Sequence, residues 1–270
     1  MGVSRSALYQ YVKRTDQNQI PADFELIAKV KEIHKTRDKD TYGSRRMAHE
    51  LRTAGYVVGR YRARSLMKRA KVVAASAKRF KKTTDSKHRL PVAPNLLERQ
   101  FVAAAPDRVW CADITYLWTL QGWLYVAIII DLFSRKIVGW AMSSRMAASL
   151  VEEALKMAYW RRKPAAGLMH HSDRGSQYAA LDYQRLLSGY GMRCSMSRKG
   201  DCWDNAVAES FFHTLKADRT SRVIYTSRQE ARADVIDYIE MFYNSQRLHS
   251  TLGYVSPNEF ERIQNRSLVA

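Results

Sequence analysis

The chain has 270 residues, of which 46% are hydrophobic and 26% charged, a composition typical of a folded globular protein and not of a disordered one. Lys and Arg number 45 against 26 Asp and Glu, so the net charge is +19 and the isoelectric point is near 10.0. This excess indicates a polyanionic partner, either nucleic acid or an anionic membrane surface, with a merely solvated basic surface as the third interpretation.

The cysteines and the apolar runs exclude further classes. Cys111, Cys194 and Cys202 show no CxxC or Cys/His spacing, so neither a disulfide framework nor a structural zinc site is indicated. The longest unbroken apolar run, from Trp123 to Ile130, has eight residues, whereas a membrane helix needs about 20. We therefore expect a cytoplasmic protein with no membrane partner.

The first third of the chain carries most of the charge and is predicted to be helical. Residues 1–95 contain 23 Lys or Arg against 8 Asp or Glu, a balance of +15. A Ser-capped basic helix is expected at residues 2–9. Apolar residues at three- and four-residue spacing predict a second helix from Phe24 to Thr36, with one buried stripe.

Two more helices are predicted before the charge pattern changes. Ser44 is expected to cap a helix that ends at Gly55, and a densely basic helix follows from about Val57 to Ala70. Such a set is typical of a small DNA-binding module. We therefore expect residues 1–70 to form a helix-turn-helix-like DNA-binding region, with DNA contacts from Arg60, Arg62 and Arg64.

A basic, proline-containing linker is predicted at residues 71–95, and the catalytic region, residues 96–270, follows it. The pattern there changes to the order βββαβαβαα. Three antiparallel strands followed by helix-linked strands describe an α/β fold with a mixed sheet flanked by helices. The expected strands are 109–119, 123–130, 135–142, 167–172 and 192–196, and the expected helices are 147–162, 182–188, 203–216 and 227–244.

Two aspartates occupy unusual places in the predicted sheet. Asp113 lies within a strand that is apolar on both faces, where an unpaired carboxylate is costly, so a metal ion explains it better than an ion pair does. Asp173 ends a short strand and begins a glycine-containing turn, where ligand-binding residues gather, although an ordinary turn aspartate fits equally well. His171 would share a face with Asp173, either to orient a ligand or simply as a packed histidine.

A third acidic residue lies on a predicted helix. Helical spacing aligns Glu209, His213 and Lys216 on one polar stripe, opposite an apolar packing face. The stripe could address metal and DNA, or it could be the exposed face of any amphipathic helix. Two strand acids and a helix acid can converge at a sheet edge, as two-metal phosphoryl transfer requires.

Other charged residues compete for these roles. Asp131 is interpreted mainly as a turn former, with contact to the metal site as the alternative. Asp201 and Asp204 fit a helix cap and a first-turn acid, so both are interpreted as structural. The basic segment that contains Arg198 and Lys199 is predicted to contact DNA.

The motifs that contain these residues resemble those of OrfB-type transposases of bacterial insertion sequences, members of the DDE retroviral-integrase-like superfamily. The 35 residues between Asp173 and Glu209 resemble the DDE spacing. The likeness runs from Trp110 to Phe260 and reaches residues 42–46 in the first domain. The motifs lie at residues 110–116, 131–135, 171–178, 204–212 and 243–249.

The resemblance implies an RNase H-like five-stranded core that uses Mg²⁺, with Mn²⁺ as a substitute, to cut DNA at the element's ends and join the freed 3′-hydroxyls to target DNA. It implies that Asp113, Asp173 and Glu209 are the catalytic metal ligands and that Lys216 and His213 contact DNA. No covalent intermediate is expected. A homo-oligomer on DNA is expected, and so is the upstream-frame protein as a fusion or partner.

Two further hypotheses remain beside a strand-transfer enzyme. One is a non-catalytic DNA-binding descendant of a transposase, and the other is a structure-selective nuclease on the same fold. A tyrosine recombinase built on Tyr243, Arg247 and His249 is disfavoured, because the scattered Arg/His set that it requires is not evident in the sequence.

Overall fold

The computed structural model describes residues 5, 19–75, 90–198 and 201–269. The chain divides into two compact units, residues 1–76 and 77–270. The helix expected at residues 2–9 lies, apart from Arg5, outside the described residues. Within the described part of the chain, no helix combines the length and the apolar character needed to cross a membrane.

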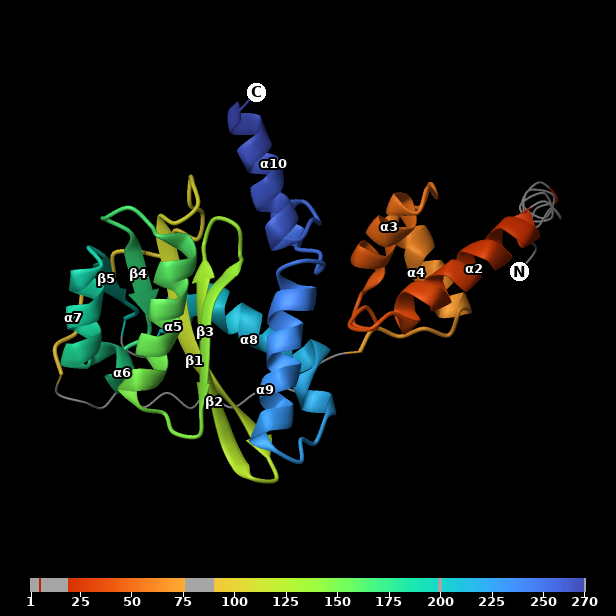
Figure 1. Cartoon of the computed structure of the whole chain (residues 1–270). Helices are drawn as coiled ribbons and strands as arrows, with labels where there is room; N and C mark the ends of the chain where they lie inside the picture. The colour runs from red at the N-terminus through yellow and green to blue at the C-terminus, as the bar shows by residue number, and fades with distance from the viewer. Residues whose placement is uncertain (1–4, 6–18, 76–89, 199–200, 270) are drawn as a thin grey trace. The chain divides into compact units, whose positions relative to one another are not determined.

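From residue 19 onward, the described part of the first unit contains α2 (Gln19–Lys35), α3 (Ser44–Thr53) and α4 (Arg60–Arg69) (Figure 1). The apolar stripe predicted for α2 is confirmed, because its members face the other two helices and are buried. The first unit is thus a helical module with a core of its own. That core includes Leu26, Val30, Ile33, Met47, Leu51 and Leu66.

Two helix starts in this unit differ from the prediction. Ser44 is the first residue of α3 and not its cap, since Gly43 occupies the cap position in an extended conformation. The basic helix α4 begins at Arg60 instead of Val57, because Gly59 is extended and interrupts the helical pattern. Gly55 follows the end of α3 as expected, and its φ of +91° is a conformation that glycine adopts without strain.

Both ends of the predicted linker are packed. Ala75 N donates to Asp40 O at 3.1 Å within the helical unit, and Met196 N donates to Pro94 O at 3.3 Å within the second unit. Of the residues between them, 76–89 lie outside the described part of the chain. The linker predicted over residues 71–95 therefore stays a prediction in its middle part.

The second unit contains the predicted mixed five-stranded sheet (Figure 1), with the strand order β3-β2-β1-β4-β5. Antiparallel pairing joins β1 to β2 and β2 to β3, whereas β4 pairs in parallel with β1 and β5. This is the mixed sheet expected from the order of elements, in the RNase H-like arrangement that the family resemblance implied. The strands are β1 (Val109–Thr119), β2 (Gly122–Asp131), β3 (Ile137–Ser143), β4 (Met169–Ser172) and β5 (Arg193–Met196).

Helices flank the sheet on both sides, with α5, α6 and α7 on one face and α8 and α9 on the other (Figure 1). The short α6 and the final α10 were not predicted. The helix expected from Trp203 begins as a 3₁₀ turn, Cys202–Asn205, and the helix expected over 227–244 widens into a π turn at Tyr238–Tyr243. The helices are α5 (Ala148–Arg162), α6 (Ser176–Ala179), α7 (Leu181–Gly189), α8 (Ala206–Asp218), α9 (Arg228–Asp237) and α10 (Pro257–Val269).

Candidate active site

The register of β1 and β4 brings two of the predicted carboxylates together. The strands are parallel, and Cys111 stands opposite His171. Asp113 and Asp173 each follow this aligned pair by two residues, so they occupy matching positions on the same side of the sheet. Since β4 ends at Ser172, Asp173 lies where the chain leaves the sheet and turns.

The electrostatics of Asp113 bring in the third acid. Burial raises the pKa of Asp113 well above its usual range, and the neighbouring carboxylates of Asp173 and Glu209 raise it further. The Ile114 N–H, which donates to Asp113 Oδ1 at 2.8 Å, and the ammonium of Lys216 act in the opposite direction. The three acids therefore form one group, which we call the carboxylate cluster: Asp113, Asp173 and Glu209.

The turn after β4 holds Asp173 in place. The Gly175 N–H donates to Asp173 Oδ1 at 2.9 Å, and a Cβ atom at position 175 would lie 3.0 Å from that oxygen. Asp173 is thus a turn former and a member of the carboxylate cluster at once. The two interpretations that the sequence left open do not exclude one another.

Glu209 is exposed on α8, on the polar stripe that the sequence predicted. His213 is exposed one turn later, and the ammonium of Lys216 lies 5.4 Å from the centroid of the Tyr116 ring. Burial lowers the pKa of Lys216, while the charge of Asp113 raises it. The opposite face of α8 is buried through Phe211, Phe212 and Leu215, which fixes the direction of the stripe.

The sequence analysis missed Asn205, which ties α8 to the central strand. Its side-chain amide donates to the Ala112 carbonyl at 3.0 Å, and both groups are buried. Ala112 precedes Asp113, and Asn205 precedes Glu209 by one helical turn. This hydrogen bond therefore sets the position of Glu209 relative to Asp113. An asparagine directly before a helix was the available signal, but it predicts a cap and not this contact.

The loop before α8 is organised by Asp204, which confirms its structural interpretation. The buried carboxylate accepts from Arg198 Nε at 3.0 Å, from Arg99 Nε at 2.9 Å and from Asn95 Nδ2 at 2.9 Å. These bonds, led by that of Arg198, hold the pKa of Asp204 well below its usual range. Asp201 accepts from the Trp203 N–H at 3.2 Å and caps the 3₁₀ turn.

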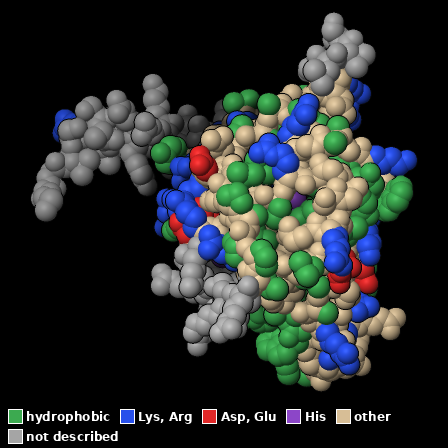
Figure 2. Space-filling model, turned by 90° about the vertical axis from the view of Figure 1, so that its left-hand side faces the viewer, with side chains coloured by type: hydrophobic (Ala, Val, Ile, Leu, Met, Phe, Trp, Pro, Cys, Tyr) green, Lys and Arg blue, Asp and Glu red, His purple; other side chains and the backbone are tan. Residues whose placement is uncertain are grey.

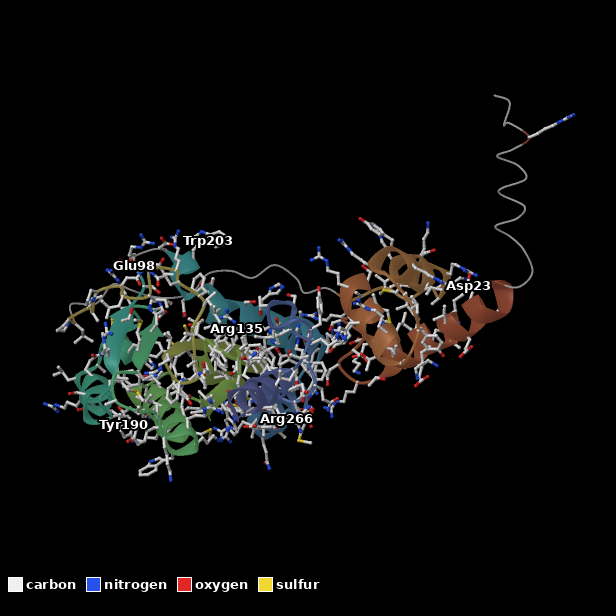
Figure 3. All side chains as sticks on the ribbon, turned by 90° about the horizontal axis from the view of Figure 1, so that it is seen from above. Asp23, Glu98, Arg135, Tyr190, Trp203 and Arg266 are labelled. Carbon is white, nitrogen blue, oxygen red and sulfur yellow. The ribbon has the colours of Figure 1, made fainter. Side chains whose placement is uncertain are left out.

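The two basic residues predicted to contact DNA in this loop have different outcomes. The guanidinium of Arg198 is paired with Asp204, so its first role is to hold the loop. Lys199 lies outside the described residues. Trp203 projects from the edge of the unit near Glu98, as Figure 3 shows, and its side chain is exposed. The loop therefore presents an aromatic side chain beside the helix that carries Glu209.

Asp131 is a turn former, as the main interpretation held. Its carboxylate accepts from the N–H groups of Asp107 at 2.9 Å and Phe133 at 2.8 Å, and Arg162 lies 3.6 Å away. Burial raises the pKa of Asp131 to about 7. Arg162 also pairs with Glu261 of α10. Asp131 therefore belongs to a network that attaches α10 to the sheet.

The histidines and the tyrosine that competed for catalytic roles are packed. His171 is buried, with Nδ1 2.8 Å from Ser195 Oγ, and burial lowers its pKa to about 4. Tyr243 is buried, and Arg247 donates to Asp218 at 2.8 Å in the same interior network. Neither arrangement exposes a nucleophile, so the recombinase alternative fails.

The arginines predicted to contact DNA in the first unit are exposed on α4. Arg60 lies over the Tyr61 ring at 5.9 Å, and Arg62 shares Asp23 with Arg69. Arg64 is exposed on the same helix. The face of α4 away from the core is therefore basic.

Divalent cations fit the chemistry of the carboxylate cluster. All three side chains offer hard oxygen donors, and a bound cation would offset the repulsion that raises the pKa of Asp113. The buried Tyr178 hydroxyl, whose pKa is raised by burial and by Asp113 and Asp173, has no hydrogen-bond partner among the described residues. It would suit a water on such an ion.

Within the described ranges, no three His, Cys, Asp or Glu side chains are close enough to coordinate one ion together. Two-metal sites need only a pair of protein carboxylates at each ion, because waters and substrate oxygens complete the coordination. Asp113, whose pKa is raised by both other acids, is the carboxylate that both pairs would share.

Comparison with known proteins gives the family. A model described as an integrase core domain matches residues 103–202, a second one matches residues 190–257, and an HTH-like domain matches residues 21–80. The "Insertion element IS600 uncharacterized 31 kDa protein" of Shigella sonnei is 46% identical over 259 residues, which are 96% of this chain and 95% of that protein.

A second relative carries a functional name. The "Transposase InsF for insertion sequence IS3A" of Escherichia coli (strain K12) is 46% identical over 226 residues, 84% of this chain and 78% of that protein. Among solved structures, the HTLV-2 integrase catalytic core domain in complex with magnesium is 12% identical, with a TM-score of 0.42, over 59% of this chain and 97% of that chain. At the identity and coverage of the two relatives, the chain belongs to the IS3-type insertion-sequence transposases, DDE-type polynucleotidyl transferases built on an integrase core.

Proposed function

We propose that Asp113, Asp173 and Glu209 are the catalytic residues with which this transposase cuts the DNA at the ends of its element and joins them to target DNA. Two divalent ions, Mg²⁺ with Mn²⁺ as a substitute, would be held by these carboxylates, activating the attacking oxygen and stabilising the leaving one. The observation that carries the proposal is the register of β1 and β4, which puts Asp113 and Asp173 at matching positions, with Glu209 near enough to raise the pKa of Asp113.

The remaining residues of the site position these three. Asn205 fixes the start of α8 against Ala112, and the Gly175 N–H holds the Asp173 carboxylate at the end of β4. Lys216, beside Tyr116 and within the field of Asp113, supplies a positive charge next to the reaction site. That charge suits a DNA phosphate adjacent to the bond that is cut.

We propose that DNA contacts are divided between the two units. Lys216 and His213 on α8 would contact the terminal DNA, and Arg60, Arg62 and Arg64 on α4 would contact phosphates further from the cut. Arg198 would act mainly by ordering the loop that carries Lys199, since its guanidinium is paired with Asp204.

The number of DNA segments in the reaction suggests how the protein assembles. Two element ends are joined to one target, so we propose that the chain works as a homo-oligomer on DNA in the cytoplasm, where bacterial DNA lies. We also propose the upstream-frame protein as its fusion or partner. Co-purification of the two reading frames on duplexes that carry both element ends tests this assembly, and a chain that stays monomeric on such DNA contradicts it.

The catalytic proposal is tested with purified protein, duplexes ending in the element's terminal sequences, and Mg²⁺ or Mn²⁺. We expect cleavage and joining by the unaltered chain and neither by the Asp173→Asn variant. Asp182→Asn is the matched control, because that acid is exposed on α7. Hydrolysis without joining would indicate a nuclease, and binding without turnover would indicate a non-catalytic DNA-binding protein.

A further inference from the structure

The hairpin formed by β1 and β2 ends in large apolar side chains that are exposed instead of packed in the core. Trp118 is 55% exposed, Leu120 66% and Trp123 42%. The rings contact one another edge to face, with centroids 4.8 Å apart for Trp118 and Trp123 and 4.9 Å for Tyr116 and Trp123. In Figure 1 this hairpin extends below the sheet, and the same end of the molecule in Figure 2 carries a group of hydrophobic side chains. An exposed apolar group of this kind marks an interaction site.

The hairpin end is held in one conformation. Thr119 Oγ1 donates to the Gly122 carbonyl at 2.7 Å, and the Leu120 N–H donates to the Tyr225 carbonyl at 2.9 Å. Arg228 Nε donates to the Trp123 carbonyl at 3.0 Å. Because these bonds fix the backbone that carries the aromatic side chains, little backbone ordering entropy opposes binding.

The charges around the hairpin end favour an anionic partner. Residues 114–130 contain no acidic residue, and neither do residues 219–229 beside them. Lys216 lies over the Tyr116 ring at 5.4 Å, and Arg228 brings its guanidinium to Trp123. The next acid along, Glu230, accepts from Thr226 at 2.7 Å. Aromatic side chains interleaved with cations are the chemistry that binds unpaired bases and their phosphates.

The hairpin end is also continuous with the carboxylate cluster. Strand β1 leads from Asp113 through Tyr116 to Trp118, and helix α8 leads from Glu209 to Lys216, which meets β1 at Tyr116. Trp118 lies five residues after Asp113 along the strand, a path of about 17 Å. A strand that keeps the stacked spacing of about 3.4 Å per nucleotide spans this length with about five nucleotides.

We infer that the hairpin surface, made of Tyr116, Trp118, Leu120, Trp123, Lys216 and Arg228, binds unpaired DNA bases about five nucleotides from the bond that the enzyme cuts. The aromatic side chains stack on bases, and the two cations contact the phosphates between them. The binding itself rests on the hairpin alone, whereas its distance from the cut rests on the proposed function of the carboxylate cluster.

The inference is tested by binding of the full chain to a fluorescent 20-nucleotide oligothymidine strand in about 0.3 M salt, which suppresses sequence-independent phosphate contacts. We expect Trp118→Ala to weaken binding about tenfold, because one base–aromatic stack contributes on the order of 1–3 kcal/mol. Trp118→Tyr should retain most of the affinity. Trp160→Ala, which removes an equally exposed tryptophan from α5, should change nothing.

Leu120→Lys separates DNA from the rival occupant, a second copy of this chain. A lysine at the hairpin end should tighten oligothymidine binding and weaken apolar self-association. If Trp118→Ala binds oligothymidine within twofold of the unaltered chain, the inference is overturned. It is equally overturned if Leu120→Lys binds DNA no better but abolishes a dimer seen by sedimentation. Should Trp118→Ala fail to fold, Leu120→Lys and Trp118→Tyr give the answer, because both keep the strand packing.

A photo-crosslinking scan fixes the position and keeps the two proposals apart. Terminal DNA that carries 5-iodouracil at successive unpaired positions should crosslink to the hairpin about five nucleotides from the cut. The Asp173→Asn variant should crosslink equally well without cleaving. Loss of cleavage with crosslinking intact supports both proposals. Cleavage with no hairpin crosslink at any position overturns the inference while leaving the catalytic proposal in place.

Discussion

Asp113 and Asp204 are two acids of the same unit that the fold treats in opposite ways. Asp204 is fully buried, yet the guanidiniums of Arg198 and Arg99 hold its pKa well below the usual range. Asp113 has its pKa raised by burial, and the neighbouring carboxylates of the cluster outweigh the single ammonium of Lys216. Asp204 has its counter-ions within the chain, whereas Asp113, which we propose to be catalytic, has other carboxylates as neighbours and would suit a cation from solution.

The comparison predicts its largest effect at Asp113. Asp113→Asn should abolish cleavage and joining, a loss of at least about a thousandfold, because it removes the carboxylate that we propose as a ligand of both ions. The same variant should melt at an equal or higher temperature, since it removes the repulsion between Asp113 and its two neighbouring carboxylates. Assays of strand transfer and thermal unfolding on one preparation check both parts, and a variant that loses activity only because it unfolds would contradict the comparison.

The reverse outcome is expected at Asp204. Asp204→Asn should lower the free energy of unfolding by about 3 kcal/mol, because two guanidiniums lose a buried partner. Urea unfolding measures the change, with Asp182→Asn as the exposed control. A loss smaller than that of the control would show that the Asp204 pairs contribute nothing to stability.

His170 is a third buried ionisable group, and it stays neutral instead of pairing with a counter-ion. Burial lowers the pKa of His170 to about 3, and Tyr183 Oη lies 2.9 Å from its Nε2. When the pH is lowered from 7 to 5, the unfolded chain gains a proton at His170 and the native chain does not. The free energy of unfolding therefore decreases by about 2 kcal/mol over this range. Unfolding of His170→Asn across this range should lose that slope, and an unchanged slope would show that His170 does not cause it.

The smallest predicted effect concerns the placement of α8. Asn205→Ala removes the hydrogen bond from the side-chain amide to the Ala112 carbonyl. We therefore expect kcat to fall about tenfold, equivalent to about 1.4 kcal/mol, with little change in KM for DNA. Asn205→Asp, which keeps the size of the side chain but cannot donate to a carbonyl when ionised, should not rescue the rate. Equal losses in binding and in kcat would argue for a general structural role.

The sequence predicts the sheet and the two strand acids well, because both depend on local pattern. Runs of apolar residues indicate β1 to β3, and Asp113 and Asp173 are recognisable from an apolar strand and a glycine turn. The order of the elements also gives the mixed sheet. That Asp113 and Asp173 lie side by side depends on the register of β1 and β4, in which Cys111 stands opposite His171. The sequence does not reveal this register.

The sequence fails where the partner lies far along the chain. Arg99 meets Asp204 across 105 residues and Asn205 meets Ala112 across 93, so neither contact has a local signal. Arg198 was predicted to contact DNA although its ion-pair partner, Asp204, lies only six residues along the chain. The π turn after α9 was also missed, since the apolar spacing continues through it and only the hydrogen bonds change.

A change of metal preference tests the central claim most directly. In Asp173→Cys the hard carboxylate becomes a softer thiolate, which binds Mn²⁺ better than Mg²⁺. If Asp173 ligates the metal, strand transfer by this variant should be undetectable with Mg²⁺ and measurable with Mn²⁺, while the unaltered chain works with both. Asp182→Cys should behave as the unaltered chain. If Asp173→Cys has equal activity with the two metals, Asp173 is not a metal ligand and the account fails.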